Sequence, residues 1–134
     1  MKTNNKGFTL IEIIAVLVII GVLAAIAVPA VLNTIENSRK DSYIATANVM
    51  VSAAKTAYGY SDAIFSDNSA TLSELISAGY MEDITNDPWG KAFDKNSSNI
   101  QISGSTYMVT LTSTNGSKKI SNVDSKNLSR DSVQ

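Results

Sequence analysis

The hydrophobic positions of this 134-residue chain follow three successive patterns. Residues 13–32 are apolar almost without interruption, residues 47–58 carry apolar side chains at three- and four-residue steps, and residues 100–123 alternate. The first two patterns are typical of helices, the second with one buried face, and the third is typical of strands with one buried face. The order predicts a long N-terminal helix followed by a small sheet.

The two helical patterns join into one predicted helix, because no proline or glycine lies between Ala30 and Tyr58. Gly59 is its predicted end. The stripe expected to face the sheet consists of Ala47, Met50, Val51, Ala54, Ala57 and Tyr58. A helix of about 50 residues is about 75 Å long, which exceeds a domain of about 100 residues, so the helix is expected to protrude.

Residues 13–32 are long enough to span a membrane, because twenty apolar residues rise about 30 Å as a helix. Lys2 and Lys6 precede them, and the positive-inside bias predicts a cytoplasmic N-terminal end and an exported remainder. A signal peptide has a shorter apolar region, of about 7 to 15 residues. The small residues at 25 and 27 nevertheless fit a signal-peptidase site, so an exported binding module released after Ala27 is an alternative.

Glu12 places a carboxylate beside this apolar run. A charged side chain at the centre of a membrane helix costs about 2.5 to 3.5 kcal/mol on insertion scales, and less near the end. Glu12 therefore requires a partner and is a candidate functional residue, although it could simply be solvated at the headgroup level. Gly21 and Pro29 are predicted weak points of the helix, because proline lacks the amide that would bond to the carbonyl of Ala25.

The composition argues against several classes of function. Without cysteine there is neither a disulfide framework nor a thiolate metal site, and without histidine the commonest general base and metal ligand is missing. An enzyme is not expected, and no catalytic residue, cofactor or metal site is assigned. The net charge is −1, and Arg39-Lys40 and Lys118-Lys119 are the only adjacent basic pairs. Intrinsic nucleic-acid binding is therefore not expected either.

The middle of the chain predicts a polar loop over residues 59–70 and a short helix after it. Thr71 and Glu74 have the spacing of a capping box, and Gly79 stands at the position that ends a helix in the left-handed conformation. The side chains expected in the core are Leu72, Leu75 and Ile76.

Asp87, Pro88, Trp89 and Gly90 predict a tight structural turn anchored by the only tryptophan of the chain. The alternating positions after it predict a three-stranded antiparallel meander with Asn115-Gly116 as a hairpin turn. Residues 124–134 are polar and are expected to be mobile. Asn122, Asp124 and Asp131 match the spacing of no recognised calcium loop.

The predicted fold class is α+β. A long N-terminal helix, with a transmembrane half and an amphipathic half, packs on the small antiparallel sheet.

The segment Lys6-Gly7-Phe8-Thr9-Leu10-Ile11-Glu12, with the apolar helix directly after it, resembles the class III leader and N-terminal helix of type IV prepilins and the related pseudopilins. The Asp-Pro-Trp-Gly turn after Gly79-Tyr80 is similar to the central region of type II secretion major pseudopilins. The resemblance implies a pilin-like lollipop with a leader peptide over 1–7, a transmembrane and filament-core helix over 8–32, and a head domain over 33–134.

The resemblance also implies a function. Prepilin peptidase would cut between Gly7 and Phe8 and methylate the new amine of Phe8, and Glu12, Gly21 and Pro29 would serve assembly. The expected partners are other copies in a helical homopolymer, the peptidase, the pilus assembly platform, and the membrane before assembly. The subunit would lie in the cytoplasmic membrane first and in a cell-surface pilus later. The alternative is a major pseudopilin of a type II secretion or DNA-uptake system.

Overall fold

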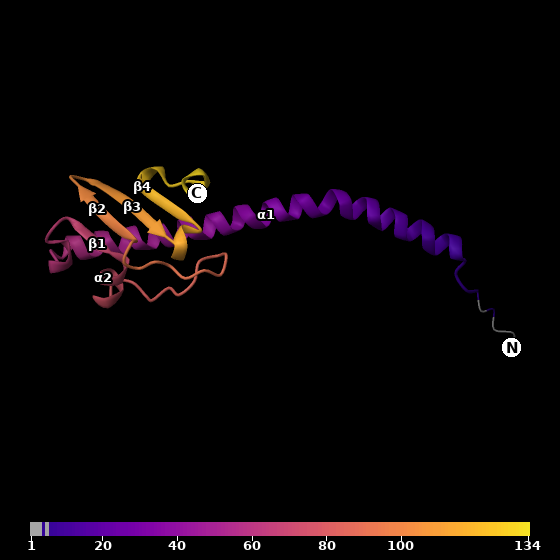
Figure 1. The fold of residues 1–134 in the computed structure, drawn as a ribbon, viewed down its shortest axis with the longest axis horizontal. Coiled ribbons are helices and arrows are strands. Elements are labelled where there is room, and N and C mark those ends of the chain that lie inside the picture. Colours follow the sequence, from indigo (N-terminus) through magenta and orange to yellow (C-terminus); the bar gives the residue numbers. More distant parts are fainter. Residues whose placement is uncertain (1–3, 5) are drawn as a thin grey trace. The chain divides into compact units, whose positions relative to one another are not determined.

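The computed structural model describes residue 4 and residues 6–134. Their contacts form two compact units, one that ends at Glu36 and one, called the head below, that comprises Asn37–Gln134. The helix α1 (Leu10–Gly59) contributes to both units (Figure 1). The predicted long helix and its end at Gly59 are therefore confirmed.

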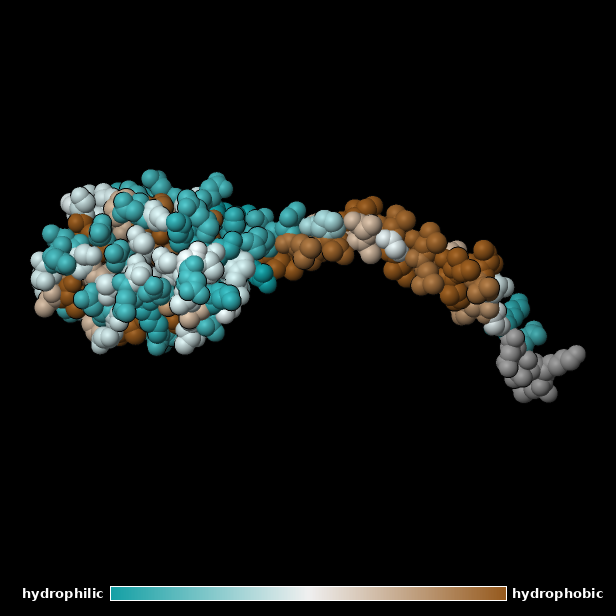
Figure 2. Space-filling model, in the orientation of Figure 1, coloured by the Kyte–Doolittle hydropathy of each residue, from teal (hydrophilic) through white to brown (hydrophobic). Residues whose placement is uncertain are grey.

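The first unit exposes its apolar side chains. Every residue of α1 from Leu10 to Ile35 is exposed, and Figure 2 shows hydrophobic side chains along this part of the helix. By length and composition, α1 is able to cross a membrane. The helix continues through Gly21 and Pro29 without a break. That these two residues weaken the helix stays a prediction.

The head contains a four-stranded antiparallel sheet in the order β1-β2-β3-β4 (Figure 1). The strands are β1 (Ser69–Thr71), β2 (Asn99–Ser103), β3 (Thr106–Thr112) and β4 (Lys119–Asp124). The meander of the last three strands is confirmed, but the predicted strand number is wrong because β1 lies in the segment predicted as a loop. A strand of three small, mostly polar residues is too short to show an alternating pattern.

The connection before the sheet contains two short helices, η1 (Ala63–Phe65) and α2 (Leu72–Ser77). The predicted capping box is present, because the side chains of Thr71 and Glu74 each accept from the other's backbone amide, at 3.2 and 2.8 Å. Gly79 has a φ of +80°, as its position after the helix requires. Of the three predicted core residues here, Leu72 and Leu75 are buried and Ile76 is partly buried.

The core of the head lies between α1 and the sheet. From α1 it takes Tyr43, Ala47, Met50, Val51, Ala53, Ala54 and Ala57, and from the strands it takes Ala70, Ile100, Ile102, Val109, Leu111 and Ile120. The short alanine side chains allow the helix to lie close to the sheet. The prediction that Tyr58 belongs to the stripe of α1 that faces the sheet is wrong. Tyr58 is 41% exposed, and its ring lies edge-on to that of Phe65.

The turn between β3 and β4 has the predicted residues but a longer form. Asn115 and Gly116 both have positive φ angles, of 62° and 64°, within the short helix η2 (Thr114–Gly116). The pairing of β3 with β4 is then interrupted by a bulge at Thr110 and Asn122, where the amide of Asn122 donates to the Thr110 hydroxyl at 3.2 Å.

The C-terminal segment is ordered, so the prediction of a mobile end is wrong. It forms the short helices η3 (Ser125–Asn127) and η4 (Arg130–Ser132), and Val133 is buried. The backbone of Gln134 exchanges two hydrogen bonds with Lys119, at 2.9 and 3.0 Å. Val133, the partly buried Leu128 and the edge of β4 therefore hold a segment whose composition is mostly polar.

Tyr43 connects α1 to this end of the sheet. Its buried hydroxyl lies 3.1 Å from the carbonyl of Leu111, 3.0 Å from that of Lys118 and 3.3 Å from the Ser113 hydroxyl. Burial raises the pKa of Tyr43 to about 12, the Ser113 hydroxyl opposes this rise, and the nearby charge of Asp87 adds to it.

The buried hydroxyl predicts a loss of stability at alkaline pH. The unfolded chain releases the Tyr43 proton near pH 10 and the folded head only near pH 12, so the free energy of unfolding should fall between these values by about 2 to 3 kcal/mol. Chemical denaturation of residues 37–134 at a series of pH values measures it. Tyr43→Phe should be less stable below pH 10, by about 1 kcal/mol, and should lack this part of the decline. Parallel curves for the two proteins would contradict the assignment.

Candidate functional site

Gly7 and Phe8 lie before the first turn of α1 and are both exposed, Phe8 by 86%. A Cβ atom added to Gly7 would meet no other atom within 4 Å. Packing within the described part of the chain therefore does not require glycine at position 7. A requirement for glycine at this position would come from another molecule that binds this segment.

Thr9 and Glu12 form a capping box at the start of α1. The backbone amide and the hydroxyl of Thr9 both donate to Oε2 of Glu12, at 2.7 and 2.9 Å, and the amide of Glu12 donates to the Thr9 hydroxyl at 3.3 Å. These bonds satisfy amides that the first turn of a helix leaves without partners. Thr9 is not among the residues predicted above, although it has the same spacing to Glu12 that Thr71 has to Glu74.

Glu12 also borders apolar surface. With Phe8, Ile13 and Val16 it lines a hollow of about 480 Å³. Among the described residues, its second carboxylate oxygen, Oε1, has no hydrogen-bond partner. The arrangement therefore presents a negatively charged acceptor, held in place by Thr9, next to the exposed Phe8.

The other residues predicted to act in assembly are not brought to this site. Gly21 and Pro29 lie about 13 and 25 Å farther along α1 by the helix rise, and a Cβ added to Gly21 would also meet nothing within 4 Å. Their role remains a prediction. Lys2, predicted to hold the N-terminal end in the cytoplasm, lies outside the described residues.

The predicted turn at 87–90 is closed mainly by Asp87, which is only 5% exposed. Its Oδ1 accepts from the amides of Trp89 and Lys91, at 2.9 and 2.8 Å, and its Oδ2 accepts from the Ser113 hydroxyl at 2.5 Å. Through Ser113 the carboxylate reaches the Tyr43 hydroxyl. The turn is thereby tied to both β3 and α1.

Trp89 is half-buried at the edge of the core, not enclosed by it. Its ring lies edge-on to Tyr43 at 5.9 Å between centroids, and Nζ of Lys118 lies 4.8 Å from the ring centre. Sequence analysis identified the turn from its Asp-Pro and Gly residues. It could not identify Ser113 as the partner, because 26 residues separate Ser113 from Asp87.

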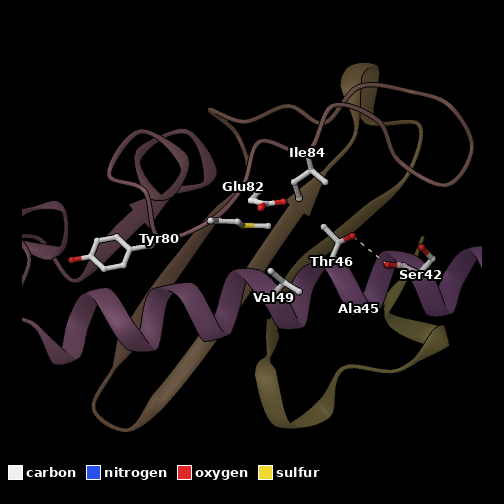
Figure 3. Close-up of a pocket in the computed structure, with 8 residues that line it drawn as sticks. Ser42, Ala45, Thr46, Val49, Tyr80, Glu82 and Ile84 are labelled. Atoms are coloured by element: carbon white, nitrogen blue, oxygen red, sulfur yellow. Dashed lines mark hydrogen bonds between the residues drawn. The ribbon is translucent and has the colours of Figure 1, made fainter.

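A groove of about 460 Å³ runs along the head between α1 and the loop after α2. In Figure 3, Thr46 and Val49 project from the helix toward the loop that carries Glu82 and Ile84. Its walls are mostly apolar, and Glu82 is their only ionisable carboxylate. This lining suits the packing of another polypeptide and offers no nucleophile paired with a base.

No group of three or more His, Cys, Asp or Glu side chains within the described part of the chain is placed to hold a metal ion. Two of the candidate calcium ligands have structural contacts. Asp124 caps η3 by accepting from the amide of Lys126 at 2.9 Å, and Asn122 forms the bulge in β4.

Comparison with known proteins identifies relatives for two parts of the chain. Residues 2–28 match the family described as the prokaryotic N-terminal methylation motif. The type IV major fimbrial protein FimA of Dichelobacter nodosus is 45% identical over 56 residues, which are 42% of this chain and 36% of FimA. The chain thus spans about a third of the fimbrial relative that it matches.

The second group of relatives matches more of the chain. The type II secretion system core protein G of Escherichia coli K12 is 30% identical over 103 residues, 67% of this chain and 70% of the relative. The corresponding protein of Klebsiella pneumoniae is 29% identical over 103 residues, 67% of this chain and 73% of the relative. No solved structure matches the chain significantly.

The contacts of Asp87 predict that this residue matters more for stability than the tryptophan beside it. Asp87→Ala removes the acceptor of three hydrogen bonds at a buried site, so residues 37–134 should lose about 3 kcal/mol or more. Replacing a fully buried tryptophan with alanine typically lowers the free energy of unfolding by about 3 to 5 kcal/mol. Trp89→Ala should cost less than this, because Trp89 is only half-buried. Thermal unfolding by circular dichroism, with the exposed Asp131→Ala as control, measures both. A larger loss from Trp89→Ala would show the order to be wrong.

Proposed function

The chain belongs to the family of type IV pilins and type II secretion pseudopilins, and we propose that it is a structural subunit of a type IV pilus. The observation that carries the proposal is the exposed apolar part of α1, which begins with the charged acceptor Glu12. Such a surface requires a cover of lipid or of other apolar helices. A filament with these helices inside and the heads outside provides that cover.

Processing would begin at the exposed segment before α1. We propose that prepilin peptidase cuts between Gly7 and Phe8 and methylates the new amine of Phe8. The match to the N-terminal methylation motif supports this step. The surroundings of Gly7 also support it, because no contact within the described part of the chain requires glycine at this position.

The new amine would supply the positive charge that Glu12 lacks. Oε2 of Glu12 is held by Thr9, while Oε1 remains available to an amine. Within one filament the carboxylate of one subunit would accept from the Phe8 amine of its neighbour and so fix the axial register. At 4 Å, two unit charges attract by about 4 kcal/mol at an effective dielectric of about 20, before desolvation is subtracted.

The subunit would first lie in the cytoplasmic membrane, with α1 as its span, and would then pass through the pilus assembly platform into a homopolymer at the cell surface. Gly21 and Pro29 would allow α1 to loosen when helices pack together, since both weaken a helix. No enzymatic activity and no intrinsic nucleic-acid binding are part of this function.

A second candidate is a major pseudopilin of a type II secretion or DNA-uptake system. The specific observation in its favour is that the similarity to core protein G covers 67% of the chain, against 42% for the fimbrial relative. Electron microscopy of sheared surface material separates the two. Long surface fibres labelled against this chain support the pilus, and their absence from cells that process the chain supports the pseudopilin.

The cleavage site predicts a strong dependence on the size of residue 7. Gly7→Ala should mature largely as the unmutated chain does, whereas Gly7→Val should accumulate as precursor in the membrane, because a bulky side chain keeps the peptidase from the backbone. Intact-mass spectrometry of membrane and sheared fractions measures this. A Gly7→Val chain that matures normally would refute the proposed site, and a mature chain that begins at Val28 would support the exported binding module instead.

The two roles of Glu12, capping α1 and pairing with an amine, predict different results for two variants. Glu12→Gln keeps an acceptor for Thr9 but loses the charge, and Glu12→Val loses both. Both variants should insert into the membrane at least as well as the unmutated chain and should yield at least tenfold fewer filaments, because a pairing of about 1.4 kcal/mol or more is lost. Thr9→Val, which keeps the charge, is the control and should assemble better than either. Abundant filaments from Glu12→Gln would show that Glu12 acts only by capping α1 and not by pairing with an amine.

A further inference from the structure

We propose that five basic residues of the head, Arg39, Lys40, Lys118, Lys119 and Arg130, form a collar that binds anionic lipid headgroups. The inference rests on the membrane stage of the proposed function. It adds a binding surface and a partner of defined chemistry, the outer leaflet of the membrane from which the subunit is drawn.

Three long-range contacts gather the collar at one end of the head. Arg130 donates to both carboxylate oxygens of Asp41, from Nε and Nη2, at 2.6 Å each. The Tyr43 hydroxyl bonds to the carbonyl of Lys118 at 3.0 Å. Asp41 and Tyr43 follow Arg39 and Lys40 within about one helical turn. Segments almost 90 residues apart in the chain therefore place their basic residues around the first turns of α1 in the head.

The collar begins close to the apolar segment in the sequence. Only six residues separate Arg39 from Leu32, the last apolar residue of the predicted span. The headgroup region on each side of a bilayer is about 5 to 8 Å thick, and the Debye length at physiological salt is about 8 Å. Long, flexible basic side chains this few residues from a membrane span are attracted to anionic lipid phosphates.

The charge of the head is also unevenly distributed. At the collar end of the head, five basic residues stand against Asp41, Asp87 and Asp131, a net charge of +2. Residues 56–86, in contrast, contain five acidic residues and no lysine or arginine. An anionic surface would therefore attract the collar end of the head and repel the segment that contains η1, β1 and α2.

Arg39 and Lys40 lie on the side of the predicted span where the positive-inside bias disfavours basic residues. Two basic residues close to the exported end of the span equal the number, Lys2 and Lys6, at the cytoplasmic end, and they reduce the asymmetry that orients the helix. Binding to lipid phosphates gives these residues a role that topology does not.

Trp89 provides the reporter for a test, because it is the only tryptophan and its ring centre lies 4.8 Å from Nζ of Lys118 in the collar. The full chain is reconstituted into vesicles of phosphatidylcholine, either alone or with about a third phosphatidylglycerol. Both contain a phosphatidylcholine with a nitroxide on its headgroup. Quenching of Trp89 should be about twofold greater in the anionic vesicles, and this difference should disappear at about 0.5 M salt.

Two variants with equal charge changes locate the effect. Arg39→Gln/Lys119→Gln removes two exposed collar charges and should abolish the difference between the vesicles. Lys55→Gln/Lys126→Gln removes two exposed charges elsewhere, since Lys126 lies beyond the opposite end of β4, and should preserve it.

Equal quenching in both vesicles, or equal loss in both variants, would overturn the proposal. Co-sedimentation of the chain with each vesicle is measured in parallel. A chain that fails to co-sediment with either kind contradicts the membrane stage as well, whereas a chain that co-sediments with both but shows equal quenching contradicts the collar alone.

Discussion

From Leu10 to Ile35 the chain exposes a helix whose side chains are almost all apolar, and no other part of its own unit covers them. Exposure of apolar surface to water costs free energy in proportion to the exposed area. The core of the head is formed by side chains from Tyr43 onward and takes none from this segment. The molecule therefore depends on a cover from outside, which lipid supplies to a single subunit and neighbouring helices supply to a filament.

In the proposed filament, the polar residues at the start of α1 would make this exchange of cover selective. An apolar helix alone would pack with many partners in any register, whereas Glu12 makes one register favourable when an amine lies opposite it. Thr9 stabilises the carboxylate in the isolated chain by two hydrogen bonds. The proposed collar would add a second polar contact, between the head and the lipid headgroups.

Much of this architecture could be predicted from the sequence, because local patterns determine it. The length of α1, its end at Gly59, the Thr71–Glu74 cap and the meander of β2 to β4 all follow from short-range periodicity and turn residues. The contacts that were missed join distant segments. Asp87 with Ser113, Arg130 with Asp41, and Gln134 with Lys119 leave no periodic signal, and β1 is too short to produce one. The cap at Thr9 was predictable, because its spacing to Glu12 is the spacing recognised at Thr71.

The most direct test is a cryo-electron microscopy reconstruction of fibres sheared from cells that produce this chain. We expect α1 from Phe8 onward to lie at the centre of the fibre, with its apolar side chains covered by other copies and the Glu12 carboxylate within hydrogen-bond distance of a neighbour's Phe8 amine. A fibre built from heads alone, with the residues before Asn37 absent or exposed at its surface, would contradict it.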